Sequence, residues 1–254
     1  MPKSAFRRVR ELVAEEIPVT MATVVRGESV GRRMIVLPDS VEGSLGDEAF
    51  DAQVAEIARE LLAAERSETR DVDGQEVFFD VHPLPQHLVI FGAVHVAQPL
   101  SRYAQDLGFR VTVVDARKAL ATEERFPNVD RLIKAWPKDA YAQMTIGPNT
   151  WIAILSHDPK FDEPAILGAL ATDARYIGAV GSRKTNADRR ERLRESGVSD
   201  EDLARLHGPI GLNIGGQTPE EMAISILGEM IAIRYGRDGG MLREAAGSIR
   251  GDSR

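Results

Sequence analysis

Cysteine is absent from this sequence of 254 residues. Its absence excludes disulfide bonds, thiolate metal sites, iron–sulfur clusters and a cysteine nucleophile in this chain. A chain of this length can bury a sufficient hydrophobic core without such cross-links. The lack of cysteine fits a cytoplasmic protein, and we expect that location.

Long apolar runs are also missing. The basic N-terminal residues are followed by Glu11 and Glu15 rather than by the apolar segment of a signal peptide. The most apolar stretch, residues 222–233, contains Glu229 and is too short to cross a bilayer. We therefore expect no membrane partner.

The chain also lacks an excess of positive charge. The chain has 32 Lys and Arg against 39 Asp and Glu, a formal net charge of −7. Non-specific nucleic-acid binding depends on Lys and Arg that neutralise phosphates, so we expect no nucleic-acid partner. The five histidines are scattered and no zinc motif occurs, so no metal site is predicted.

What is present predicts two α/β domains. Residues 1–82 mix short strands with an amphipathic helix and predict a smaller N-terminal α/β domain, which ends at a proline-rich segment, 82–85. Residues 86–254 predict a Rossmann-like C-terminal domain with a mostly parallel sheet, because short apolar strands alternate there with helical patterns. Those strands are expected at residues 87–91, 111–114, 150–155 and 176–180.

The last long helix has a clear start signal. Thr218 can cap it, Pro219 suits its first turn, and Glu221 completes a capping box. Its body is apolar on nearly all sides, which predicts a buried structural helix.

The strongest motif spans residues 90–97, between a predicted strand and a predicted helix. Gly92 would make the tight turn, and the first helical amides would face a phosphate. Asp115, 23 residues later at the end of the next strand, would accept a hydrogen bond from a ribose hydroxyl. Val94 replaces the second glycine of the dinucleotide fingerprint, whereas Ala97 is an accepted variant at the third. The alternative is that Gly92 only makes the turn.

Two further strand ends carry polar residues. His157 could transfer a proton or bond a ligand, or residues 157–158 could simply cap the following turn. Gly181, Ser182 and Arg183 suit a phosphate or another anion.

Other polar and glycine-rich segments favour structural roles. We expect the helix over 185–195 to be solvated, as are the carboxylates of residues 162–163. The glycine-rich segment 208–216 faces a ligand or serves as a compact connector.

Together these segments resemble the C-terminal Rossmann domain of the xanthine dehydrogenase accessory protein (XdhC/CoxI) family. The resemblance is carried, in order, by residues 92–97, 108–117, 156–158, 176–183, 209–215 and 218–221. The first half resembles the smaller domain of that family more faintly, at residues 23–26 and 42–46. The family's N-terminal loop usually contains a cysteine, which the matching stretch 43–48 lacks.

The resemblance implies a cofactor-maturation protein rather than an enzyme. Such proteins bind the molybdenum cofactor (molybdopterin), protect it during sulfuration and deliver it to a molybdenum hydroxylase of the xanthine dehydrogenase type. The implied partners are the hydroxylase apoenzyme and a sulfurtransferase, and we expect a homo-oligomer. The residues expected to bind the cofactor lie at the strand ends described above: Gly92, Ala93, Val94, His95, Val96, Asp115, Arg117, His157, Gly181, Ser182 and Arg183.

Two other functions stay open. One is an NAD(P)-dependent oxidoreductase, in which His157 would donate the proton. The other is a partner-docking protein whose Rossmann half has lost its ligand.

Overall fold

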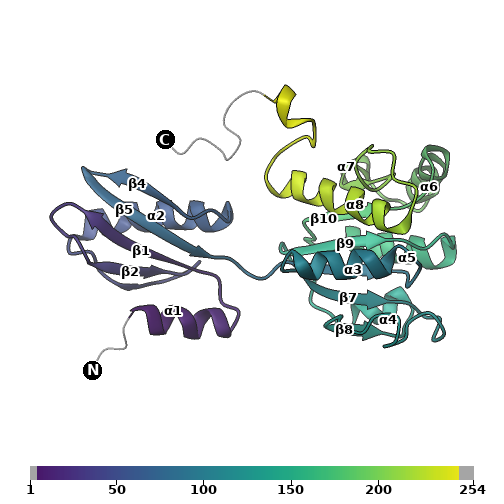
Figure 1. The fold of residues 1–254 in the computed structure, drawn as a ribbon, viewed down its shortest axis with the longest axis horizontal. Helices are drawn as coiled ribbons and strands as arrows, with labels where there is room; N and C mark the ends of the chain where they lie inside the picture. Colours follow the sequence, from purple (N-terminus) through teal and green to yellow (C-terminus); the bar gives the residue numbers. More distant parts are fainter. Residues whose placement is uncertain (1–4, 246–254) are drawn as a thin grey trace. The chain divides into compact units, whose positions relative to one another are not determined.

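The structure, a computed structural model, describes residues 5–245, which form two compact units divided between Leu84 and Pro85 (Figure 1). This division falls in the proline-rich segment where the sequence predicts a boundary. The outer ends of the two predicted domains, residues 1–4 and 246–254, lie outside the described residues.

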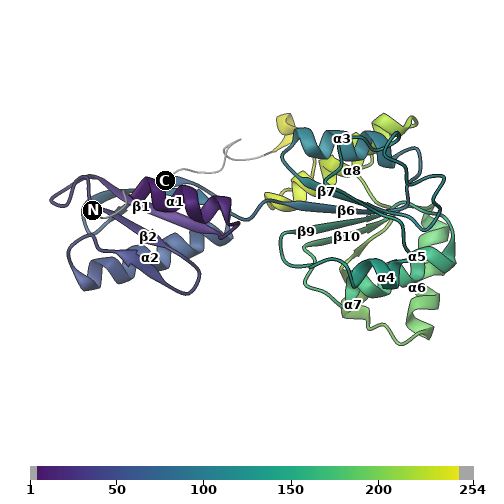
Figure 2. The ribbon, with the colours of Figure 1, turned by 90° about the horizontal axis from the view of Figure 1, so that it is seen from below.

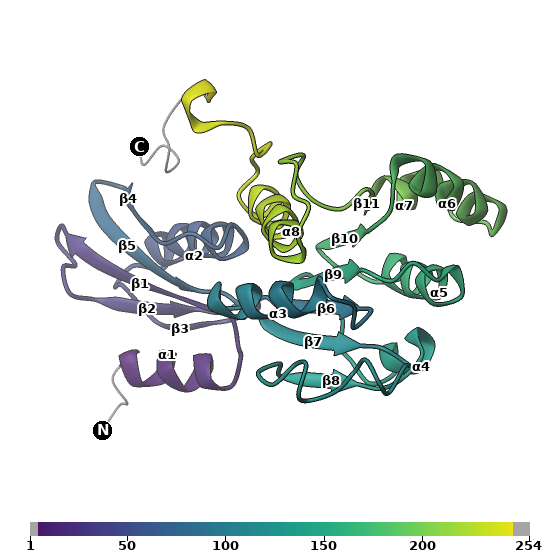
Figure 3. The ribbon, with the colours of Figure 1, turned by 45° about the vertical axis from the view of Figure 1, so that its right-hand side comes forward.

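The first unit is a five-stranded sheet with one helix on each face (Figure 3). All its strand pairs are antiparallel, in the order β3-β2-β1-β5-β4. The α2 side of the sheet holds the larger apolar cluster, around Phe50 and Phe79, and the α1 side a smaller one around Leu12. The elements are α1 (Ala5–Ala14), β1 (Val19–Arg26), β2 (Arg33–Val36), β3 (Val41–Gly43), α2 (Glu48–Ala63), β4 (Glu68–Val72) and β5 (Gln75–His82).

The second unit is built on a six-stranded, wholly parallel sheet in the order β11-β10-β9-β6-β7-β8. Numbered from its own first strand, this order is 6-5-4-1-2-3, that of the doubly wound Rossmann fold. The predicted fold class is therefore confirmed. The elements are β6 (His87–Phe91), α3 (Ala97–Asp106), β7 (Arg110–Val114), β8 (Arg131–Ile133), α4 (Pro137–Tyr141), β9 (Thr150–Ile154), α5 (Pro159–Leu170), β10 (Tyr176–Ala179), α6 (Arg183–Glu195), α7 (Asp200–Ala204), β11 (Leu206–His207), α8 (Pro219–Arg234) and the short 3-10 helix η1 (Leu242–Glu244).

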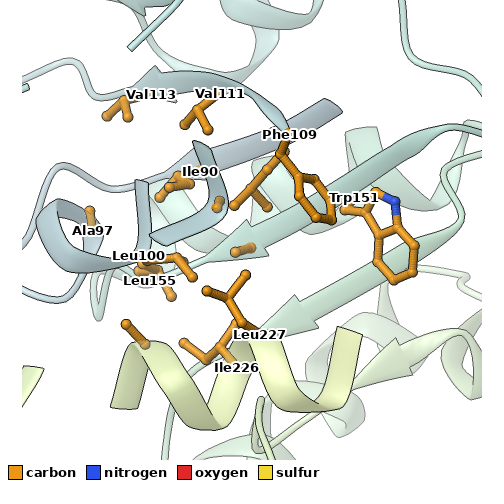
Figure 4. Close-up of a cluster of buried hydrophobic side chains, with 14 of the residues drawn as sticks. Ile90, Ala97, Leu100, Phe109, Val111, Val113, Trp151, Leu155, Ile226 and Leu227 are labelled. Carbon is orange, nitrogen blue, oxygen red and sulfur yellow. The ribbon is translucent and has the colours of Figure 1, made fainter. Parts of the chain in front are cut away.

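Helices cover both faces of this sheet, as parallel strands require. Helices α3 and α8 lie on one face and α4 to α7 on the other (Figure 2). On the α3 and α8 side, Leu100, Ile226 and Leu227 pack against strand residues such as Ile90 and Trp151 (Figure 4). The core thus fixes α3 and α8 together over the middle of the sheet.

Helix α8 confirms its predicted start but not its predicted burial. The Thr218 side chain accepts a hydrogen bond from the Glu221 amide, and the reciprocal bond of the capping box is present. One face packs into the core, yet Ile224, Ile231 and Tyr235 are 54%, 39% and 61% exposed. The expectation of a buried helix is therefore wrong for this face. Helix α8 packs against α3 and the sheet on its other face only.

Candidate functional site

The candidate site lies at the carboxyl ends of β6 and β9, where the strand order reverses. Open α/β sheets bind ligands in the crevice outside such a switch point. Gly92 follows β6 and has a φ of +106°, which residues with a side chain rarely adopt. A Cβ atom at Gly92 would lie 2.8 Å from the backbone nitrogen of Ser156, which follows β9. Glycine is therefore needed both for the turn and for the close approach of the two loops.

The turn after Gly92 is held at both polar backbone groups of Ala93. The Ala93 N–H donates to Asp115 Oδ2 at 2.8 Å, and the Ala93 carbonyl accepts from Arg125 Nη1 at 2.9 Å. Helix α3 then begins at Ala97, so residues 94–96 form a turn that leads into it. Val94 and Val96 are half-buried, whereas His95 is exposed and lines a pocket of about 400 Å³ beside α3.

Asp115 is fully buried, and both of its oxygens are engaged by its own chain. Oδ1 accepts from the Arg117 N–H and Nε, and Oδ2 accepts from Ala93 N–H and Arg117 Nη2. Burial acts to raise the pKa of Asp115, but the hydrogen bonds from Arg117 and Ala93 outweigh it and hold that pKa below its ordinary value. A ribose hydroxyl could bond this carboxylate only if Arg117 moved away.

The three polar residues in the turn after β9 differ in burial and in their hydrogen bonds. Ser156 is buried, and its Oγ accepts from the Asp158 N–H at 3.2 Å. Asp158 caps α5 by accepting from the Lys160 N–H at 3.0 Å. His157 and Asp158 are both exposed, but only Asp158 is engaged in the helix cap.

In the turn after β10, too, one polar side chain caps a helix and another is exposed. Ser182 caps α6 by accepting from the Thr185 N–H at 3.0 Å, and Asn186 donates to the Gly181 carbonyl. Arg183 is the first residue of α6 and is exposed. The sequence predicts that Ser182 and Arg183 bind an anion together, whereas the structure engages the Ser182 hydroxyl in the helix cap and leaves the Arg183 guanidinium at the surface.

A buried ion pair beneath these turns was missed from the sequence. Asp162 and Arg189 are 2% and 3% exposed, with 3.5 Å between Asp162 Oδ2 and Arg189 Nη2. Burial raises the pKa of Asp162 to about 7, although the charge of Arg189 opposes that shift. Arg189 also donates to the Val180 carbonyl at 3.0 Å, which ties the pair to the turn after β10. The expectation that residue 162 and the 185–195 helix are solvated is therefore wrong at these two positions.

A sequence signal for this pair exists. Asn186, Arg189 and Leu193 recur at spacings of three and four, so they share one helix face, and Leu193 is buried there. A guanidinium on the same helix face as a buried leucine indicates a buried partner, because an unpaired buried charge is costly. Glu163, by contrast, pairs with Arg192 at the surface.

The glycine-rich segment 208–216 is held as a connector by Glu229 of α8. Glu229 Oε2 accepts from the Gly211 N–H at 2.7 Å and from the Tyr176 hydroxyl at 2.5 Å, and Oε1 lies 3.2 Å from His207 Nδ1. Burial acts to raise the pKa of Glu229, but its bonds to His207, Tyr176 and Gly211 outweigh it and lower that pKa. This carboxylate therefore supports the fold rather than a ligand.

Within residues 5–245, no group of three or more His, Asp and Glu side chains could hold a metal ion. No helix in that part of the chain is both long and apolar enough to span a bilayer.

Comparisons with known proteins agree with the fold. Residues 88–230 match the XdhC Rossmann domain, and residues 12–73 match the XdhC and CoxI family. A crystal structure of a xanthine dehydrogenase from Bacillus halodurans shares the fold, with a TM-score of 0.55, 19% identity, and coverage of 96% of this chain and 98% of that one.

Two curated relatives bear descriptive names. One, from Bacillus subtilis (strain 168), is named as a probable xanthine dehydrogenase component and is 33% identical over 154 residues, which cover 61% of this chain and 44% of that protein. The molybdenum cofactor insertion chaperone PaoD of Escherichia coli (strain K12) is 30% identical over 99 residues, 39% of this chain and 30% of that protein. The chain spans less than half the length of the curated relatives it matches.

Proposed function

The chain belongs to the XdhC and CoxI family, and from that membership we propose that it serves the maturation of a molybdenum hydroxylase. In this proposal it binds molybdopterin, protects it and hands it to a hydroxylase apoenzyme of the xanthine dehydrogenase type. The observation that carries the proposal is the match of both family domains, in order, along one chain. The names of the two curated relatives, one a cofactor insertion chaperone, support the cargo and the client.

The sheet edge at the switch point supports a binding role. The exposed side chains along this rim of the sheet include His157 and Arg183 and the partly exposed Arg117. Molybdopterin carries a phosphate, and guanidinium groups bind phosphate in a two-pronged geometry. The cargo would lie across the turn at 92–96, with its phosphate toward this rim.

Several polar side chains near the switch point are already hydrogen-bonded within the chain, which favours a carrier over an enzyme. Asp115, Asp158 and Ser182 all accept hydrogen bonds from the backbone of their own turns. Side chains used in this way hold loops in shape and are poorly placed to move protons on a substrate. We therefore propose an accessory protein rather than an enzyme, and we place it in the cytoplasm because the sequence has no cysteine.

An NAD(P)-dependent oxidoreductase is the second candidate. The doubly wound strand order and the exposed His157, as proton donor, favour it. The engaged Asp115 and the side chain of Val94 at the turn count against ordinary binding of NAD. Titration of the purified chain with NAD and NADP separates the two functions, since tight binding with hydride transfer to a substrate would favour the oxidoreductase.

Two partner expectations remain proposals. A sulfurtransferase would act on the cargo while this chain holds it. A homo-oligomer is supported by three exposed apolar residues on and just after α8, Ile224, Ile231 and Tyr235, which we call the α8 stripe.

Co-purification tests the cargo. The chain is expressed in cells that make the cofactor, and its bound pterin and molybdenum are measured. We expect wild type to retain both, and Arg183→Lys to lose most of them because an ammonium cannot reproduce the planar fork with which a guanidinium bonds the polar atoms of the cargo. The control is Lys184→Gln, which removes a charge from the neighbouring exposed residue. Full retention by Arg183→Lys would contradict the placement of the cargo at this rim.

A further inference from the structure

Arg117 has an unusual position for a residue beside the acid that ends the second strand of a Rossmann sheet. In dinucleotide-binding domains that acid takes a ribose hydroxyl, and a nearby arginine accommodates a 2′-phosphate. Here Asp115 holds the arginine itself, with Nε 2.9 Å from Oδ1 and Nη2 2.7 Å from Oδ2. The acid therefore acts as the anchor of a guanidinium.

The anchoring leaves Arg117 both fixed and accessible. Two side-chain bonds and its own N–H, 2.9 Å from Asp115 Oδ1, hold it against a carboxylate that is fully buried. Its side chain is nevertheless 52% exposed. A guanidinium that is already ordered loses little conformational freedom when it binds an anion, and the bonds to Asp115 leave N–H groups of Nη1 and Nη2 unused.

Val94 adds an independent constraint on the ligand. It is half-buried and packs against the core on the α3 and α8 side, at the position where dinucleotide-binding domains have a glycine that lets the pyrophosphate approach the backbone. A phosphate monoester bound at the carboxyl end of β7 does not need that approach.

We propose that the carboxyl end of β7 is an anion subsite in which Arg117 binds a phosphate monoester, in place of the usual ribose diol. This inference deepens the proposed function, because it names the group of the cargo that this end recognises. Two sources share that chemistry, the terminal phosphate of molybdopterin and the 2′-phosphate of NADP.

The subsite is tested by comparing ligands that differ in one phosphate. NADP and NAD are titrated into the full chain by calorimetry at low ionic strength, with wild type, Arg117→Gln and Lys118→Gln. We expect wild type to bind NADP at least tenfold more tightly than NAD, and Arg117→Gln to abolish the difference. Lys118→Gln, which removes a charge from the next exposed residue, should preserve it.

Inorganic phosphate and molybdopterin complete the test. If neither dinucleotide binds, phosphate should still protect wild type, but not Arg117→Gln, against thermal unfolding. Equal affinities for NADP and NAD, or no effect of Arg117→Gln in either assay, would overturn the subsite.

The outcome is separable from that of the proposed function. Molybdopterin that co-purifies equally with wild type and Arg117→Gln would leave the carrier function intact and refute the subsite. A preference for NADP that depends on Arg117, without any pterin on the protein, would support the subsite and refute the carrier function.

Discussion

At the level of single residues, Asp115 occupies a position that predicts ligand binding, but its carboxylate has a structural role. Its spacing from Gly92 fits a ribose-binding acid, but its carboxylate is consumed by Arg117 and Ala93. The spacing fixes where the acid lies at the sheet edge. It does not reveal that an arginine two residues later folds back onto it, because that depends on the path of the loop.

Removing the Asp115 charge should therefore cost stability. Asp115→Asn leaves the buried Ala93 N–H and the guanidinium of Arg117 without their carboxylate, and we expect a loss of about 1–3 kcal/mol in the free energy of unfolding. Denaturant titration at neutral pH measures it. Asp106→Asn, at an exposed acid that ends α3, is the control and should change little. Equal stability of Asp115→Asn and wild type would contradict the described role of the carboxylate.

Asp162 predicts a distinct pH dependence. Its pKa in the folded chain, about 7, lies above that of the unfolded chain, so the folded state holds a proton that the unfolded state releases. Its contribution is fully present below about pH 4 and is lost as the pH rises to about 7. Arg189, Asp158 and Glu163 are the charged groups that act on it.

The test compares pH profiles of stability for wild type and Asp162→Asn. Across pH 4–7, the variant should lack a decline that we expect to be on the order of 2 kcal/mol in wild type. Both profiles contain the other carboxylates, so the difference between them isolates this group. Parallel profiles would show that Asp162 titrates normally.

At the scale of elements, the β6–α3 turn depends on a close approach of two loops. Gly92→Ala would place a Cβ 2.8 Å from the Ser156 nitrogen at a φ of +106°. We expect a loss of roughly 2 kcal/mol or more in stability. Gly108→Ala is the matched control, since Gly108 also has a positive φ of +83° but nothing lies within 4 Å of its Cβ position.

Thermal and denaturant unfolding of the two variants separate the causes. The loss in Gly108→Ala measures the backbone strain, and the excess in Gly92→Ala measures the contact between the loops. Equal losses would mean that the loops can separate without cost.

Much of the element order was predictable, for physical reasons. The strands of the Rossmann unit are apolar runs bounded by glycine and polar residues, and the capping box at Thr218 fixes where α8 begins. The short strands β3, β4, β8 and β11 were missed, because strands of two to five residues with few buried side chains carry little periodicity.

The site was less predictable than the fold. Position at a strand end indicates that a residue is near the switch point, but it does not distinguish a helix cap such as Asp158 from a side chain without a cap role such as His157. That distinction depends on which backbone N–H groups lie within reach. The Asp162 and Arg189 pair depends further on the packing of α5 against α6.

At the scale of the whole molecule, the α8 stripe predicts self-association. Acidic residues 220–221 begin α8 and Arg234 ends it, so an antiparallel pair of α8 helices would place opposite charges together beside the apolar residues. We expect light scattering to give a dimer for wild type and a monomer for Ile231→Glu. Ala232→Ser, a small change on the buried face, serves as the control, and a monomeric wild type would contradict the prediction.

In the proposed function, this chain hands a molybdenum cofactor to a client. The most direct measurement adds the cofactor-loaded chain to a cofactor-free hydroxylase of the xanthine dehydrogenase type and follows the recovery of activity. Free cofactor in equal amount and heat-denatured loaded chain are the comparisons. We predict that the native loaded chain restores more activity, and restores it faster, than either. Recovery no greater than that with free cofactor would contradict the maturation function.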